Sequence, residues 1–92
     1  MTKIEIVREI ASKTGLSTKD VMVILESLMQ TIKSSMENGE EVFLRGFGSF
    51  IIKHRAEKTA RNISKNTTVI IPAHDVPAFK PAKEFIEMVS KG

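Results

Sequence analysis

The chain has 92 residues, no cysteine and a formal net charge of +3 at pH 7. Its length fits one small domain, residues 1–92, and the lack of cysteine excludes disulfides and thiolate zinc sites, so oligomerisation is the expected way to complete a small core. No apolar run approaches the roughly 18 to 20 residues of a membrane helix, and charges interrupt the apolar pattern at the N-terminus, which predicts a cytoplasmic protein with no membrane partner and no signal peptide.

The positive charge is concentrated in the second half of the chain. Residues 1–45 carry six lysines and arginines against seven acids, whereas residues 46–92 carry eight against four. A cationic half of this kind favours binding to nucleic acid or to an anionic membrane surface.

Two helices are predicted in the first part of the chain. Thr2 and Glu5 form a T-x-x-E capping box ahead of an apolar pattern with three- and four-residue spacing, and Gly15 is placed to end this first helix. Ser17 and Asp20 open the second helix in a similar way.

The second helix has an unusually broad apolar surface. It ends at Asn38 and Gly39, and its apolar positions are Val21, Met22, Val23, Ile24, Leu25, Leu28, Met29, Ile32 and Met36. One ordinary face of a helix is narrower than this set. We therefore expect it to pack on two partners, one in its own chain and one in another.

The apolar period changes to two after Gly39. Residues 41–45 and 49–53 predict two strands around the turn Gly46-Phe47-Gly48. The second strand is expected to continue into a two-stranded ribbon of about residues 53–75, with its tip near residues 63–66 and a returning strand at residues 67–71. This ribbon is basic and has few side chains suited to a core, so burial cannot stabilise it and an anionic partner is expected to bind it.

Three prolines, Pro72, Pro77 and Pro81, predict that no helix crosses residues 72–80. The last of them is placed in the first turn of a short C-terminal helix. The apolar face of this helix consists of Ala82, Phe85, Ile86 and Val89. The predicted fold class is therefore α+β, with two N-terminal helices, a three-stranded antiparallel sheet extended into a ribbon arm, and a short final helix.

Several short motifs along the whole chain resemble the bacterial histone-like HU and integration host factor family of DNA-bending proteins. They are Gly46-Phe47-Gly48-Ser49-Phe50, Arg55-Ala56, Ala60-Arg61-Asn62, Ile71-Pro72-Ala73 and Val76-Pro77-Ala78-Phe79-Lys80-Pro81. The resemblance implies an intertwined homodimer, or a heterodimer with a paralogue, in which the sheets form a saddle and two arms reach around duplex DNA. It also implies a location on the nucleoid.

The resemblance and the charge pattern together assign a set of DNA-binding residues. They are Lys3, Arg45, Gly46, Lys53, Arg55, Lys58, Arg61, Asn62, Ile63, Lys65, Lys80 and Lys83. Arg45 is equally well explained as a solvated charge at a strand end. Ile63 stands where the family usually has the proline of an Arg-Asn-Pro triplet, so it is the candidate wedge between base pairs, although packing on the ribbon is the alternative.

These residues predict a histone-like, nucleoid-associated protein that binds the minor groove with little sequence specificity and bends and compacts the DNA. Minor-groove edges distinguish A·T from G·C pairs and little more. The alternatives are a site-specific bender like integration host factor, and a basic arm that binds a membrane surface or an acidic protein. RNA binding remains open as a side activity, because phosphate contacts do not by themselves distinguish the two sugars.

Catalysis and cofactor binding are not expected. Phe47, Phe50 and Phe79 lie in an apolar, glycine-rich part of the chain and are expected to pack in the core rather than stack on bases. His54 and His74 lack a carboxylate or thiolate cluster that would make them a metal site. With no nucleophile, paired acid and base, or phosphate-binding loop, the chain is predicted to be a non-enzyme without cofactor or metal.

Overall fold

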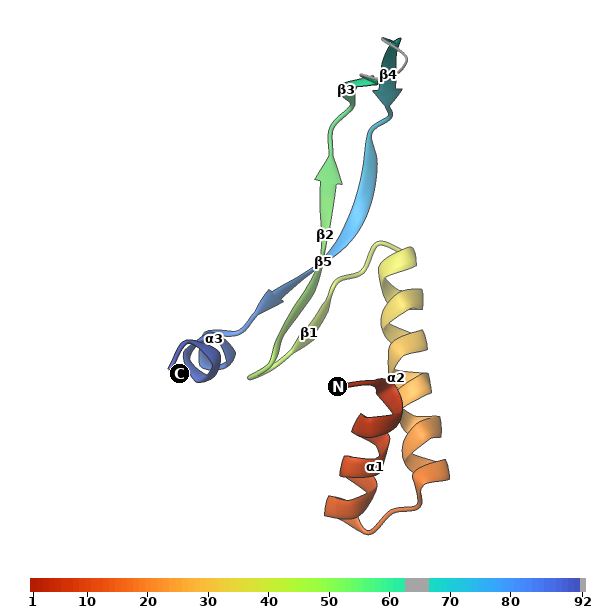
Figure 1. The fold of residues 1–92 in the computed structure, drawn as a ribbon, viewed down its shortest axis with the longest axis vertical. Helices are drawn as coiled ribbons and strands as arrows, with labels where there is room; N and C mark the ends of the chain where they lie inside the picture. The colour runs from red at the N-terminus through yellow and green to blue at the C-terminus, as the bar shows by residue number, and fades with distance from the viewer. Residues whose placement is uncertain (63–66, 92) are drawn as a thin grey trace.

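A computed structural model describes residues 1–62 and 67–91. The chain begins with two helices, α1 (Lys3–Thr14) and α2 (Thr18–Glu37), which lie side by side (Figure 1). The predicted capping box is confirmed: the Thr2 side chain accepts a hydrogen bond from the Glu5 amide, and the Glu5 side chain accepts one from the Thr2 amide. Gly15 ends α1, and the Ser17 hydroxyl accepts a bond of 3.1 Å from the Asp20 amide at the start of α2.

The core that the two helices form is small. Val7, Ala11 and Val21 are buried, and Met22 and Leu25 pack against them. The other arc of α2 is open to solvent, with Ile24 60% and Leu28 45% exposed. The predicted second apolar surface of α2 is therefore present, and the described part of the chain leaves it uncovered.

The sheet consists of β1 (Val42–Leu44), β2 (Gly48–Arg55) and β5 (His74–Pro81) in the antiparallel order β1-β2-β5. No helix crosses residues 72–80, as predicted, but most of these residues belong to β5, a strand that was not predicted from the sequence. Pro77 lies inside β5 opposite Ile52. Because β5 is an edge strand, a proline can take part without depriving a second neighbour of a hydrogen bond.

The turn between β1 and β2 depends on Gly46. The Phe47 amide donates a bond of 2.9 Å to the Leu44 carbonyl, and Gly46 between them has a φ of +83°. Residues with a side chain rarely adopt this backbone conformation, which explains why a glycine occupies position 46. β1 is short. Glu41 immediately precedes it, and the Glu41 carboxylate accepts a hydrogen bond of 2.9 Å from the Ile52 amide of β2.

β2 and β5 continue into the arm, which projects away from the helices (Figure 1). Its outer part is a second sheet of β3 (Lys58–Asn62) and β4 (Thr67–Ile71). Arg55 pairs with His74, and Lys58 pairs with Ile71, so two residues on each strand separate the two sheets without a change of register. Pro72, which has no amide hydrogen, lies in this gap. The predicted arm at residues 53–75 is thus present in two paired parts.

The arm makes the chain long for its size. The radius of gyration is 18.8 Å, and the extents are 58 × 32 × 30 Å. A globular chain of this length has a radius of gyration of about 12 Å. Much of the chain therefore lies far from any core of its own.

The chain ends in α3 (Lys83–Ser90), which starts two residues after Pro81, with Ala82 as its N-cap. The prediction that Pro81 belongs to the first helical turn was wrong, since Pro81 ends β5. Phenyl rings join α3 to the sheet: Phe47 lies 5.3 Å from Phe85 and 5.1 Å from Phe79 between ring centroids, and Phe79 lies 5.1 Å from Phe50. The sheet phenylalanines thus pack against one another, but Phe47 and Phe79 are still 46% and 39% exposed, so this chain alone does not bury them in a core as predicted.

Candidate nucleic-acid interface

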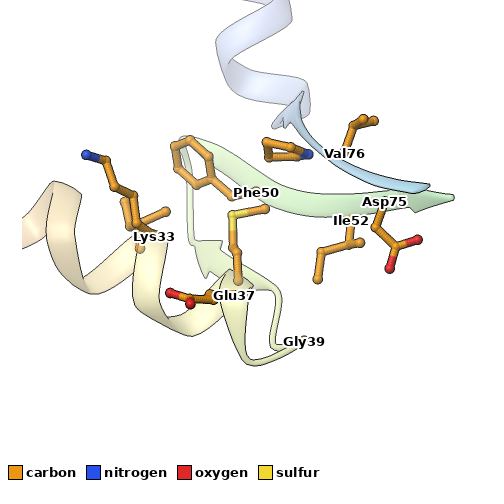
Figure 2. A pocket seen from close by; sticks show the side chains of 10 residues that line it. Lys33, Glu37, Gly39, Phe50, Ile52, Asp75 and Val76 are labelled. Carbon is orange, nitrogen blue, oxygen red and sulfur yellow. The ribbon is translucent and has the colours of Figure 1, made fainter. Parts of the chain in front are cut away.

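The two faces of the sheet have different chemistry. Residues opposite each other on neighbouring antiparallel strands share a face, so Phe50 with Phe79 and Ile52 with Pro77 define an apolar face. This face turns toward α2 and borders a cavity of about 560 Å³ that is also lined by residues of α2. Figure 2 shows Ile52 and Asp75 projecting from the strands on one side and Val76 on the other.

The opposite face carries the cations. Ser49 pairs with Lys80, Lys53 with Val76 and Arg55 with His74, and all of these residues share the side away from the apolar face. We call this side the basic face. Lys80 lies opposite Ser49, which is four residues from Lys53 on β2. The cations of the sheet are therefore spread over about 13 Å along the strand.

A shallow hollow lies at the helix α3 end of the basic face. It has a volume of about 350 Å³. Four predicted DNA-binding residues line it, namely Arg45, Gly46, Lys80 and Lys83. The structure therefore brings the turn after β1, the end of β5 and the start of α3 together, although they are far apart in the sequence.

Phe43 also lines this hollow and was not among the predicted site residues. It lies between Val42 and Leu44, which are half-buried, and its side chain is 70% exposed. In the sequence, a phenylalanine in a short apolar strand indicates a core position. Only the period of two, counted from the half-buried neighbours, would have placed it on the open side.

The outer ribbon of the arm places two of the predicted cations, Lys58 and Arg61, on opposite faces. Lys53 and Arg55 share a face, but Lys58 and Arg61 are three residues apart on β3 and so lie on opposite faces of the outer ribbon. Lys58 shares its face with Ile71, and Arg61 shares its face with Thr68. The four predicted cations of the first arm strand therefore do not all lie on one face, and their contacts with DNA stay a prediction.

The remaining predicted residues are Asn62, Ile63 and Lys65. Asn62 ends β3, while Ile63 and Lys65 lie outside the described residues. On β4, Val69, Ile70 and Ile71 are 47%, 63% and 39% exposed. The described part of the arm thus presents apolar as well as cationic side chains to solvent.

Lys3 differs from the other predicted cations because it has an acidic partner in its own chain. Its Nζ binds the Glu26 carboxylate of α2, and both side chains are half exposed. Lys3 must leave this ion pair, or share it, before it can bind a phosphate.

The histidines do not form a metal site. The His54 Nδ1 lies 2.9 Å from the Asp75 carboxylate, whereas the His74 Nδ1 bonds to the Pro72 carbonyl at 2.9 Å. As neighbours in register on paired strands, the two rings point to opposite faces. Residues 1–62 and 67–91 contain no cluster of three or more potential metal ligands, and no helix among them is long and apolar enough to cross a membrane.

Comparison with known proteins places the whole chain in one family. The family model described as bacterial DNA-binding protein matches residues 1–90. The integration host factor subunit beta of Marinobacter nauticus is 46% identical over 91 residues, which cover 98% of this chain and 93% of the relative. The DNA-binding protein HU of Clostridium pasteurianum is 38% identical over 91 residues, with 99% and 100% covered.

A solved structure agrees with both relatives. The cocrystal of Anabaena HU with DNA superimposes with a TM-score of 0.94 at 36% identity and covers 100% of both chains. The resemblance seen in the short motifs is thus confirmed over the full length, and with it a non-enzymatic role, because the family consists of DNA-binding architectural proteins. The chain belongs to the bacterial DNA-binding protein family, the group that contains HU and integration host factor.

Proposed function

We propose that two copies of this chain form a homodimer that binds duplex DNA through the minor groove with little sequence specificity, and bends and compacts it with two arms. The observation that carries the proposal is the alignment of Lys80, Lys53 and Arg55 on the face of the sheet that turns away from α2 and leads into the arm. A row of cations matches the phosphates along a groove.

The homodimer is supported by the apolar surface that one chain leaves open. Within residues 1–62 and 67–91, three residues form the buried core, while Ile24 and Leu28 on α2 and Phe47 and Phe79 at the sheet remain between 39% and 60% exposed. Soluble proteins seldom leave such surfaces uncovered, and a second copy would cover them. The long shape of the single chain supports the same conclusion.

Entry into the minor groove explains the bending. The groove of B-DNA is only about 6 Å wide, so a two-stranded ribbon must widen it and bend the helix. As is general for minor-groove architectural proteins, a group that includes HU and integration host factor, an apolar wedge can unstack a base step and kink the duplex. Ile63 is the proposed wedge of this chain.

Site-specific bending is the second candidate. It is favoured by the higher identity to an integration host factor subunit, 46%, than to an HU protein, 38%. The same relative favours a heterodimer with a paralogue, because its name describes one subunit of a larger protein. Competition between one defined site and bulk DNA separates the two functions, since a site-specific protein stays on its site.

Location and side activity follow from the main proposal. A cytoplasmic protein that compacts DNA resides on the nucleoid. The cations of the basic face and the arm also allow RNA to bind, and a parallel titration with duplex RNA tests this.

A gel-shift series on linear, nicked and gapped duplexes of equal length tests the proposal, with the mass of the free protein measured alongside. We expect a dimer that binds nicked and gapped DNA more tightly, because a distorted duplex is easier to bend. A monomer, or a protein with equal affinity for all three duplexes, would contradict the proposal.

A further inference from the structure

The most exposed phenylalanine of the sheet stands among cations. Phe43 of β1 lies opposite Ser49 of β2, which in turn lies opposite Lys80 of β5. These three residues form one row across the basic face. The ring is 70% exposed and borders the same hollow as Arg45 and Lys83.

This surface is not suited to a subunit interface. Val42 and Leu44, the neighbours of Phe43, turn to the apolar face, where the sheet meets α2. Phe43 lies on the opposite face, which it shares with Ser49 and Lys80, and it lines the hollow. Charged residues are depleted from the centres of protein interfaces, so a second copy of the chain is expected to cover the apolar face and α2 rather than this row.

The chemistry of the row matches a duplex minor groove. A bound partner must offer anions to Arg45, Lys80 and Lys83, and a surface that an apolar ring can cover between those anions. The minor groove has phosphates along both edges, with sugars and the base-pair floor between them. A membrane surface also has anions, but interfacial binding uses several large apolar side chains on one face. Of the apolar residues that line this hollow, Leu44 and Pro81 belong to the row of Gly48 on the apolar face, and Ala82 is small. Phe43 is therefore the one large apolar side chain that lines the hollow from the basic face.

We propose that Phe43 determines base preference by lying in the minor groove beneath the sheet and selecting against guanine; this inference rests on the proposed DNA binding. The groove floor of a G·C pair differs from that of an A·T pair by the guanine 2-amino group, which is a hydrogen-bond donor. A phenyl ring has no strong acceptor for this donor. Covering the amino group removes it from water without a replacement bond, which is costly.

Inosine provides the test, because it pairs with cytosine but lacks the 2-amino group. We expect wild-type protein to bind an inosine-substituted duplex roughly fivefold or more tightly than the matching G·C duplex, in line with the cost of one buried, unbonded donor. In the Phe43→Gln variant this ratio should fall close to one, since the glutamine carbonyl accepts a bond from the amino group. Phe43→Leu, which stays apolar, should keep most of the preference.

Two controls distinguish this role from a structural one. Leu16→Gln changes an exposed apolar residue in the connection between α1 and α2, far from the sheet (Figure 1), and should leave the ratio unchanged. The mass and the thermal unfolding midpoint of Phe43→Gln should equal those of the wild type. A lower mass, a lower midpoint or an unchanged inosine ratio in Phe43→Gln would overturn the inference while leaving DNA binding intact. A wild type that binds no duplex would overturn the proposed function, and this inference with it.

Discussion

Gly48 and Phe79 lie so close together on the apolar face of the sheet that a Cβ atom on residue 48 would stand 2.6 Å from the Phe79 ring and 2.7 Å from the Lys80 carbonyl. Gly48 is buried, and the Phe79 ring above it also contacts Phe47, Phe50 and Phe85. The absence of a side chain on one residue therefore allows four rings to pack against a three-stranded sheet.

Gly48→Ala should destabilise the fold. The added methyl group forces the ring or the strand to move, and overpacking of this kind costs about 1 to 3 kcal/mol. Urea denaturation measures the change in the free energy of unfolding. Gly39→Asn is the comparison for backbone strain without overpacking, because nothing lies within 4 Å of a Cβ there, whereas its φ of +85° strains any side chain, asparagine less than most. Equal stability of Gly48→Ala and wild type would show that the sheet yields more easily than the contacts indicate.

Loss of a cation from the basic face should reduce the salt dependence of DNA binding. Each phosphate contact contributes about 0.9 to the slope of log K against log salt, so Lys53→Gln should lower the slope by about that amount per arm. Lys19→Gln, at the start of α2 and away from the sheet, is the matched control (Figure 1). Equal losses for the two variants would argue against a specific role for the basic face.

Glu26→Gln should tighten DNA binding. The substitution releases Lys3 from its ion pair and removes a negative charge, while the stability should change by no more than about 1 kcal/mol, because exposed ion pairs contribute little. Glu9→Gln removes the partner of Lys13, an exposed i,i+4 pair near the far end of α1, and serves as the control. A gel-shift titration at low salt compares them, and equal binding by Glu26→Gln and Glu9→Gln would mean that the freed Lys3 gains no contact with DNA.

The exposed arc of α2 should be essential for the dimer. Ile24→Lys places a charge where a second chain is expected to cover the helix, and the cost of burying it should separate the subunits. Analytical ultracentrifugation reports the mass. Ile70→Lys, at an equally exposed apolar position on the arm, should remain dimeric. If both variants keep the wild-type mass, the subunits meet elsewhere.

Ile63→Ala should reduce the bend angle more than the affinity. Unstacking of a base step costs about a few kcal/mol, which an apolar wedge helps to meet, whereas the phosphate contacts of the arm remain. Energy transfer between dyes at the two duplex ends measures the angle, and Ile70→Ala on β4 is the control. An unchanged angle would leave Ile63 without the wedge role.

Local signals predicted the two N-terminal helices well. The capping pairs Thr2 with Glu5 and Ser17 with Asp20 act within one turn, so the starts of α1 and α2 could be placed from neighbouring residues alone, whereas the start of α3 could not. The broad apolar surface of α2 likewise predicted its uncovered arc. The strand β5 was missed because a proline such as Pro77 argues against a strand in the middle of a sheet. Only the strand order shows that β5 lies at the edge of the sheet, where proline is tolerated.

The sequence predicted which types of residue belong to the candidate site, but not which face of the sheet or ribbon each of them occupies. A run of cations from Lys53 to Arg61 indicates an anionic partner, yet the division of Lys58 and Arg61 between two faces depends on the strand alternation of the outer ribbon. Phe43 was missed for a related reason. Its residue type indicates burial, and the hollow that it shares with Lys83 forms only when the ends of β1, β5 and α3 meet in space.

The unchanged register on both sides of the gap in the arm has a mechanical consequence. Arg55 with His74 and Lys58 with Ile71 remain correctly matched whether or not the stretch between them is straight. A bend within these two residues per strand would therefore break no pair of either sheet, and the outer ribbon would change direction as one piece.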